Sequence, residues 1–315
     1  MALEHSASHA VLELRAAINA EIRAFFAERG VLEVETPALS PAATPDPALE
    51  SIEARARVLG RAHYLHTSPE YAMKRLLAAG SGHIYQLCRV YRDGELGRWH
   101  QPEFMLLEWY RVGWTELELM AEVEALVVRV LGTAGRALTA RRTSYREAFA
   151  DALGVDAFGD LAGLPGLLAE RGIETPEGLS RDALLDLALG TVVAPAFPDD
   201  ALTFVYDYPA TQAALAEIKA QTPPVAARFE AFVGGVELAN GFRELTDAAE
   251  QARRFAAETE ARRRAARPAP PLDRAFLAAL ARLPPCAGVA LGVDRLVALA
   301  AGADSLAAAL TFAHH

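Results

Sequence analysis

The sequence predicts an α+β fold in which helices flank a largely antiparallel sheet. With 315 residues, 52% of them hydrophobic and 23% charged, the chain can bury one large core. The strands are expected in hairpin-like pairs and not in regular strand-helix-strand units, which disfavours a doubly wound sheet. Two common phosphate-loop patterns, Gly-x-x-x-x-Gly-Lys-Ser/Thr and a strand-linked Gly-x-Gly-x-x-Gly, are missing from the sequence. Any nucleotide would therefore be bound by another kind of site.

The first third of the chain predicts a long helix, a short strand, a loop and a second helix. These elements are expected at residues 10–29, 31–35, 41–47 and from residue 68 onward. Apolar side chains recur at helical spacing in the first of them, and Gly30 follows as a stop signal. Ser68 is placed to cap the second helix, with Pro69 at its first position.

Two strands around a polar loop come next, and their hairpin has a functional-looking tip. The remaining expected elements are strands at 83–91, 103–112, 202–207, 226–233, 236–243 and 288–293, and helices at 115–131, 247–266, 273–283 and 294–301. Residues from about 144 to 198 are rich in Leu and Ala and are interrupted by Gly and Pro. This stretch predicts an inserted helical subdomain without an assignable role.

The composition excludes several classes of protein. A net charge of −10 and a pI near 5.4 disfavour a broad basic surface for RNA. No stretch supplies the roughly 18 uncharged apolar residues that a membrane span needs, and residues 1–9 do not resemble a signal peptide. Cys88 and Cys286 lack metal-ligand spacing and are expected to be reduced and buried. We expect a cytoplasmic protein.

One local concentration of basic residues interrupts this acidic balance. It comprises Arg253, Arg254, Arg262, Arg263, Arg264 and Arg267. Such a run could dock an acidic partner or form a solvated helix face, and the solvated face is the more common outcome.

The tip of the first hairpin, residues 92–104, combines cations, an imidazole and aromatic rings. Such a loop can hold phosphate and stack a base, although a solvated hairpin tip would look similar. In the second half, Gly234-Gly235 suits a two-residue turn. This turn would place Phe232 opposite Glu237 and make Glu230 the diagonal neighbour of Glu237. Two carboxylates in one patch repel unless a cation such as Mg²⁺ lies between them, or unless both are solvated.

Two further segments carry candidate ligands. Simple alternation puts Glu244 on the face opposite Glu237, and a β-bulge at Asn240-Gly241 could redirect it. Near the C-terminus a strand ends at Gly292, and a helix begins with Asp-Arg. Arg295 beside this glycine suits a phosphate or an adenine face, whereas the simpler interpretation is a capped helix.

Together these segments resemble the three signature motifs of class II aminoacyl-tRNA synthetases. The motifs correspond to residues 17–37, which form helix-strand-Pro, to residues 92–104, which end in His-x-Pro-Glu-Phe, and to Gly-x-Asp-Arg at 292–295. Within that class, residues 67–70 (Thr-Ser-Pro-Glu) and 237–245 (Glu-Leu-Ala-Asn-Gly-Phe-Arg-Glu-Leu) are similar to lysyl-tRNA synthetase. The resemblance spans residues 10–312 and implies one catalytic domain over residues 1–315.

The resemblance implies ATP and Mg²⁺ as ligands and an aminoacyl-adenylate as the first product. Arg92 would bind the α-phosphate, Phe104 and Arg295 would sandwich the adenine, and His100 would hold the triphosphate. The full set of implied ATP contacts is Arg92, Asp93, Gly94, Glu95, His100, Gln101, Phe104, Glu237, Leu238, Gly292 and Arg295. Arg92, Glu237 and Arg295 would be catalytic, and Glu230 and Glu237 would carry Mg²⁺. Glycine at position 94 and glutamine at position 101 depart from the usual motif.

The implied amino-acid contacts are Ser68, Pro69, Glu70, Tyr110, Asn240, Glu244 and Ala290. Glu70 would hold the amino group near the carboxylate, while Glu244 and Tyr110 would recognise a distal ammonium. Ala290 occupies a position where lysyl-tRNA synthetases usually have glycine. Its methyl group is expected to disfavour α-lysine relative to β-lysine.

The first helix begins near residue 10, which leaves no room for the anticodon-binding OB-fold of lysyl-tRNA synthetases. The resemblance therefore extends to truncated paralogues that attach lysine or (R)-β-lysine to a lysine side chain of elongation factor P. It implies elongation factor P as the partner, no stable binding of tRNA and a homodimer formed through the first motif. The alternatives are a short enzyme that acts on tRNA or another acceptor, and a catalytically inactive regulatory module.

Overall fold

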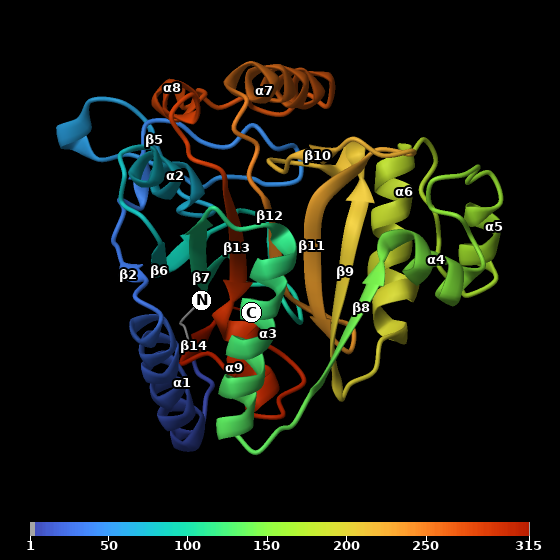
Figure 1. The fold of residues 1–315 in the computed structure, drawn as a ribbon, viewed down its shortest axis with the longest axis horizontal. Coiled ribbons are helices and arrows are strands. Elements are labelled where there is room, and N and C mark those ends of the chain that lie inside the picture. The colour runs from blue at the N-terminus through green and yellow to red at the C-terminus, as the bar shows by residue number, and fades with distance from the viewer. Residues whose placement is uncertain (1–3, 315) are drawn as a thin grey trace.

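The computed structural model describes residues 4–314, and its centre is a mixed, mainly antiparallel sheet (Figure 1). The strand order is β2-β6-β7-β13-β12-β11-β9-β8, with β10 paired to β11. These strands are β2 (Leu32–Glu33), β6 (Ile84–Tyr91), β7 (Glu103–Val112), β8 (Thr139–Ser144), β9 (Ala201–Pro209), β10 (Ile218–Lys219), β11 (Val225–Val233), β12 (Val236–Arg243) and β13 (Cys286–Gly292). Only the β2–β6 and β8–β9 pairs at the two edges are parallel. The predicted α+β class with a largely antiparallel sheet is confirmed.

Shorter strands and the helices complete the architecture. The short strands are β1 (Glu4–His5), β3 (Leu39–Ser40), β4 (Glu53–Ala54), β5 (His63–Leu65) and β14 (Phe312–Ala313). The α-helices are α1 (His9–Glu28), α2 (Glu70–Ala78), α3 (Glu116–Thr133), α4 (Tyr145–Leu153), α5 (Leu164–Ala169), α6 (Arg181–Ala188), α7 (Ala248–Arg264), α8 (Arg274–Leu280) and α9 (Val293–Ala300). In the described part of the chain, no helix is both long and apolar enough to cross a membrane.

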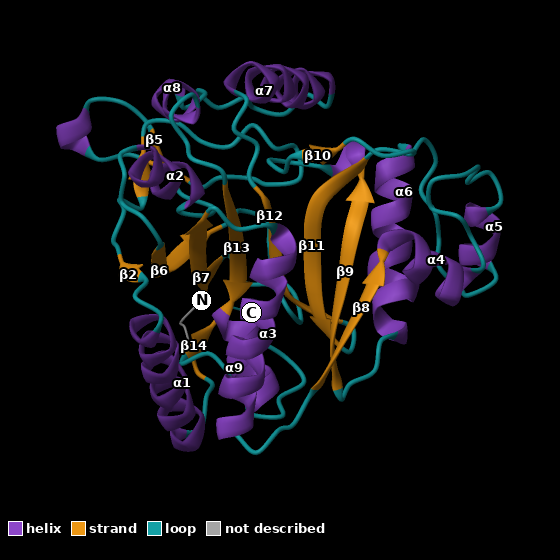
Figure 2. Cartoon of the chain, in the orientation of Figure 1, coloured by secondary structure: helices purple, strands orange, loops and turns teal. Residues whose placement is uncertain are grey.

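Helices α1, α3 and α9 cover one face of the sheet, as Figure 2 shows, and close the main core against it. Their inward stripes include Phe26, Val123 and Leu296, which are fully buried. The amphipathic spacing that predicts these helices is thus the spacing that covers the sheet. The opposite face remains free for a site at the centre of the sheet.

Local capping signals place the helix starts within a residue or two of the predictions. Thr115 and Glu118 form a reciprocal capping box at α3. Helix α2 begins at Glu70, and the Ser68 hydroxyl accepts the Glu70 N–H at 3.0 Å. The interpretation of Asp294 as a helix cap is wrong. Its carboxylate is buried and instead accepts the Met105 N–H at 2.7 Å, so it ties α9 to β7.

The 144–198 segment folds as helices that share a core with the sheet. Helices α4 and α6 pack beside β8 and β9, and their apolar side chains join Val205, Tyr208 and Phe232 in one cluster. Because the sheet supplies part of that core, this segment extends the same domain. Strand β8 is not predicted from the sequence, since Thr139–Ser144 is polar and lacks apolar alternation.

Neither interpretation of the arginine-rich segment fits all of its members. Arg262 is 1% exposed and donates to carbonyls of the 46–49 loop and to Glu50. Arg254 binds the carbonyls of Ala214 and Ala216. Half or more of the run therefore fixes loops to α7, which hydrophilicity alone cannot indicate.

Candidate active site

Two rows of register partners cross the central strands and form the floor of the site. The first row runs Gln86, Glu108, Ala290, Asn240 and Glu230 from β6 to β11. The second, adjacent row runs Ile84, Tyr110, Gly288, Phe242 and Arg228. Directly paired residues point to the same side of a sheet, so both rows face the side away from α1 and α3. Small residues in the middle of the rows leave a hollow between two acidic flanks.

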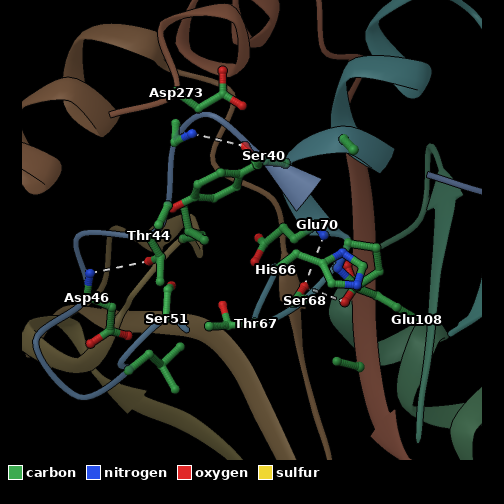
Figure 3. A pocket seen from close by; sticks show the side chains of 18 of the residues that line it. Ser40, Thr44, Asp46, Ser51, His66, Thr67, Ser68, Glu70, Glu108 and Asp273 are labelled. Carbon is green, nitrogen blue, oxygen red and sulfur yellow. Dashed lines mark hydrogen bonds between the residues drawn. The ribbon is translucent and has the colours of Figure 1, made fainter. Parts of the chain in front are cut away.

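A cavity of about 360 Å³ lies over this floor. The start of α2 and the loops around residues 39–51 and 65–69 enclose it, and Figure 3 shows Ser68, Glu70 and Glu108 converging in it. Its lining includes every predicted amino-acid contact: Ser68, Pro69, Glu70, Tyr110, Asn240, Glu244 and Ala290. The seven positions are therefore brought together, although what they bind remains a proposal.

A bulge in β12 determines the face of the sheet to which the acidic residues point. Phe232 pairs with Glu237 as expected, but Ala231 pairs with Ala239, which leaves Leu238 as the extra residue. The bulge restores Glu237 and Glu244 to one face despite their odd separation. It lies at Leu238 and not at Asn240-Gly241, so the predicted bulge exists at a different place.

Glu108 is an acidic residue of the site that the sequence did not reveal. It is 2% exposed, and its carboxylate accepts hydrogen bonds from Ser68 Oγ at 2.7 Å and from Tyr110 Oη at 2.6 Å. Burial and the charge of Glu70 raise the pKa of Glu108 to about 7, although both hydrogen bonds and Lys74 oppose this. The Tyr110 hydroxyl therefore donates to Glu108 in this structure, and its predicted contact with a distal ammonium stays a prediction.

Glu244 contacts a cation that belongs to the protein itself. The ammonium of Lys74 lies 2.6 Å from Glu70 and contacts Glu244 as well. Both Lys74 and Glu244 are 2% exposed. The predicted contact of Glu244 with a substrate ammonium stays a prediction, and Lys74 is a second cation beside this carboxylate. The available signal was the i, i+4 spacing of Glu70 and Lys74, which places both side chains on one face of a helix.

Gly288 makes room for two of these side chains. A Cβ atom at this position would lie 2.3 Å from Tyr110 Cε1 and 2.4 Å from Glu244 Oε1. No side chain fits at such distances without displacing both neighbours. Glycine is thus required here by the close approach of a ring and a carboxylate, and not by a turn.

Arg295 joins a second cluster of predicted residues, none of which lines this cavity. Its guanidinium donates to the backbone carbonyls of Glu237 at 2.8 Å and Trp99 at 3.2 Å, and lies 3.0 Å from His100 Nε2. Burial and the Arg295 cation lower the pKa of His100, so the ring is neutral at pH 7 and can accept this bond. The second and third motifs therefore meet at one arginine.

Arg92 enters the cavity from the end of β6. Its Nε donates to the Thr67 carbonyl at 3.4 Å, and its guanidinium lies 5.0 Å from the ring centre of Phe104 and 3.6 Å from Glu95. A cation thus already faces the Phe104 ring, whose predicted partner across an adenine was Arg295. Asp93 and Gly94 form an exposed turn beside this arginine, with Gly94 at φ +76°.

Three other predicted ATP contacts, Gln101, Leu238 and Gly292, are packed against the protein itself. The Gln101 amide is 3% exposed and bonds the backbone N–H and C=O of His314, so its side chain holds the C-terminal segment and not a ligand. This corrects the expected ATP contact. Leu238 is buried at the bulge, so only its backbone could face a nucleotide. Gly292 precedes α9, where a Cβ would touch only the Arg295 side chain.

The two predicted metal ligands, Glu237 and Glu230, differ in exposure and in their ion-pair partners. The Glu237 side chain is 42% exposed and lies 3.6 Å from Arg295. Glu230 is buried beside Arg228, which already neutralises it, and burial raises the pKa of Glu230 to about 7. Among residues 4–314, no cluster of three or more acidic, His or Cys side chains has the arrangement of a metal site. Glu237 fits a shared, phosphate-bound cation better than Glu230 does.

A mainly antiparallel sheet, two arginines (Arg92 and Arg295) and an acidic cavity together define the catalytic core of a class II synthetase. The family model described as tRNA synthetases class II (D, K and N) matches residues 1–315, and the chain belongs to this family. Among curated relatives, a protein of Salmonella gallinarum (strain 287/91 / NCTC 13346) and one of Salmonella paratyphi B (strain ATCC BAA-1250 / SPB7) are each 49% identical over 321 residues. Each match covers 98% of this chain and 96% of the relative, and both relatives are named elongation factor P–(R)-β-lysine ligase.

Proposed function

We propose that this protein activates (R)-β-lysine or lysine with ATP and transfers it to a lysine side chain of elongation factor P. The observation that carries the proposal is the cavity over the central strands, which has a cationic end at Arg92 and an acidic end at Glu70 and the buried Glu108 and Glu244. An amino acid with two ammonium groups matches this polarity. The names of the 49% identical relatives support the same reaction.

In the proposed first step a carboxylate oxygen of the amino acid attacks the α-phosphorus of ATP. The bond to the β-phosphate breaks, and pyrophosphate leaves. Arg92 would neutralise charge on the α-phosphate, and Arg295 and His100 would hold the outer phosphates. Catalysis would then come from positioning and charge neutralisation. Mg²⁺ held by Glu237, with Glu230 behind it, would screen the phosphate charges.

In the second step the ε-amine of the acceptor lysine attacks the carbonyl carbon of the adenylate. AMP leaves, an amide bond forms, and the amine loses a proton to solvent. We include in this proposal that the enzyme is cytoplasmic and pairs as a homodimer through α1 and β2. In support of pairing, Leu32 of β2 is 57% exposed. Light scattering of a Leu32→Asp variant, expected to be monomeric, would check the pairing.

The test compares acceptors and substrates directly. Pyrophosphate exchange with lysine and (R)-β-lysine measures activation, and transfer is followed by mass spectrometry of elongation factor P beside an aminoacylation assay with total tRNA. We expect exchange with a diamino acid and a mass increase on elongation factor P. Robust charging of tRNA without modification of the protein would instead indicate the short tRNA-acting enzyme.

Activation should weaken as the pH falls. Because burial raises the pKa of Glu108 to about 7, this carboxylate binds a proton below that pH. The protonated form cannot pair with a substrate ammonium, so KM for the amino acid should rise from pH 8 to pH 6, by up to about tenfold per unit below the pKa. KM for ATP serves as the control and should stay flat. If Glu108→Gln keeps the same pH profile, another group is responsible.

Ala290→Gly should improve activation of α-lysine relative to β-lysine. Ala290 lies in the first row between Glu108 and Asn240 and lines the cavity. If the substrate binds as the resemblance implies, the Ala290 methyl group would limit the space beside the carbon next to the substrate carboxylate. One methyl group in a tight pocket is worth roughly 1 to 3 kcal/mol, or about 10 to 200-fold in preference. The ratio of kcat/KM for the two substrates in exchange checks this. An unchanged ratio would reduce Ala290 to a packing residue.

A further inference from the structure

Lys74 is a buried cation without a role in the motifs. It lies in the second turn of α2 with its side chain 2% exposed, and its ammonium contacts Glu70 and Glu244. The rings of Phe242 and Phe276 lie 5.3 and 5.9 Å from it. A charge this deeply buried persists only where partners repay its lost hydration. Lys74 is thus buried behind the cavity lining, to which it is joined through Glu70 and Glu244.

The lysine at this position is also unusual for the chain. Of 31 basic residues only two are lysines, Lys74 and Lys219. A lysine ammonium is compact and fits between two converging carboxylates, whereas the arginine fork prefers to span one carboxylate side by side. The choice of lysine at position 74 therefore follows from the geometry of the two acids around it.

The charges around the acidic end can be counted. Three carboxylates, Glu70, Glu108 and Glu244, meet one ammonium, Lys74, which leaves a net charge of minus two when all are ionised. The other titratable neighbours are neutral, because burial raises the pKa of the Tyr110 phenol and of the Cys286 thiol well above 7. Two ammonium groups on a substrate would balance this charge.

Lys74 also decides which carboxylate oxygens remain for a ligand. It occupies one oxygen of Glu70 and contacts Oε2 of Glu244, while Oε1 of Glu244 lies over Gly288 without a hydrogen-bond partner. Burial and the charge of Glu70 raise the pKa of Glu244 to about 8, and the Lys74 cation opposes this. Without Lys74 this pKa would be higher still, so a smaller fraction of Glu244 would be charged at neutral pH.

We propose that Lys74 is a positioning residue that holds Glu244 in place between α2 and β12 and increases its charged fraction, so that the acidic end of the cavity selects a substrate with two ammonium groups. This proposal rests on the proposed function for the identity of the substrate, namely a diamino acid. It adds a residue that touches neither substrate nor ATP and acts through Glu70 and Glu244.

The test removes the charge but keeps the shape. In Lys74→Met, KM for lysine or β-lysine should rise at least tenfold at pH 7 and recover toward the wild-type value by pH 9, while kcat and the KM for ATP change little. A packing role would not produce that pH profile. Lys219→Met is the matched control, because Lys219 also bridges two carboxylates, Glu116 and Asp207, but belongs to β10 outside the cavity. Its amino-acid KM should match the wild type.

A double variant keeps the proposal testable if the single variant folds poorly. Lys74→Met with Glu244→Gln removes the cation together with the carboxylate it charges. Its amino-acid KM at pH 7 should be close to that of Lys74→Met, because position 244 is uncharged in both, and the recovery at pH 9 should disappear. A double variant with the same pH profile as Lys74→Met would overturn the proposal, as would a single variant within twofold of the wild type at pH 7.

A binding measurement separates this proposal from the proposed function. Thermal stabilisation by 1,5-diaminopentane needs no catalysis, and this diamine stays doubly charged at pH 9 because alkylammonium pKa values are near 10.4. The wild type should be stabilised at pH 7, and Lys74→Met much less. If the diamine distinguishes the two proteins but neither activates lysine or β-lysine, the proposed function fails and the role of Lys74 stands. If the wild type activates lysine and the diamine stabilises both proteins equally, the role of Lys74 fails.

Discussion

Replacing Arg295 by alanine should lower amino-acid-dependent pyrophosphate exchange by roughly 10² to 10³-fold, or about 2.7 to 4 kcal/mol in the transition state. The guanidinium is the point where the second and third motifs meet, through the carbonyls of Trp99 and Glu237 and the ring of His100. Its positive charge is expected to act on the phosphates in the transition state. Glu237→Ala should have an effect of the same order.

The comparison must separate lost chemistry from a disturbed loop. Arg89→Ala is the matched control, because Arg89 lies on β6, is half exposed and pairs only loosely with Glu103 at 3.6 Å. This variant should keep exchange within about twofold. Circular dichroism and the melting temperature of Arg295→Ala should remain close to the wild type. Near-normal exchange in Arg295→Ala would remove this arginine from the site.

Glu122→Ala should lower the free energy of unfolding by about 3 to 5 kcal/mol. The Glu122 carboxylate is buried between α3 and β7, where it accepts hydrogen bonds from Trp109 Nε1 at 3.0 Å and from Arg111 Nε at 2.9 Å. Its removal leaves the Arg111 guanidinium, itself 4% exposed, buried without its carboxylate. Urea unfolding with an unchanged m-value would measure the loss.

Two further variants test whether the loss of stability comes from the buried ion pair. Glu124→Ala removes a neighbouring glutamate of α3 whose pair with Arg142 is solvent-exposed, and it should cost less than about 1 kcal/mol. Adding Arg111→Met to Glu122→Ala should recover part of the stability, because the uncompensated charge is removed. A loss of under about 1 kcal/mol in Glu122→Ala would mean that water reaches Arg111 and replaces the carboxylate.

The fold could be predicted largely because its signals are local. The β6–β7 hairpin, the Gly234-Gly235 turn and the caps of α1 and α3 each depend on a few adjacent residues. Strand β8 could not be found in this way, since it pairs at a parallel edge and has no apolar alternation. The position of the β12 bulge at Leu238 was also hidden, because either of two nearby sites would restore the facing of Glu244.

Residues of the candidate site that belong to a sequence motif were predicted, whereas residues that packing alone brings to it were missed. Ser68, Glu70, Tyr110, Glu244 and Ala290 line one cavity, as the resemblance to lysyl-tRNA synthetase implied. Glu108 and Lys74 escaped notice because a strand glutamate and a helix lysine are usually solvated.

Their roles depend on convergence in space of β7, α2 and the end of β12. Only the structure supplies that convergence, and it reveals the contact of Tyr110 with Glu108.

The scarcity of lysine in this chain has a consequence for the proposed chemistry. An aminoacyl-adenylate acylates amines, and only an uncharged amine has the free electron pair needed for attack. Burial lowers the pKa of Lys74 and of Lys219, but the two carboxylates around each ammonium outweigh burial and raise it. In the part of the chain that the structure describes, every lysine side chain is therefore protonated and shielded by ion pairs. These two side chains are therefore poor nucleophiles toward such an intermediate.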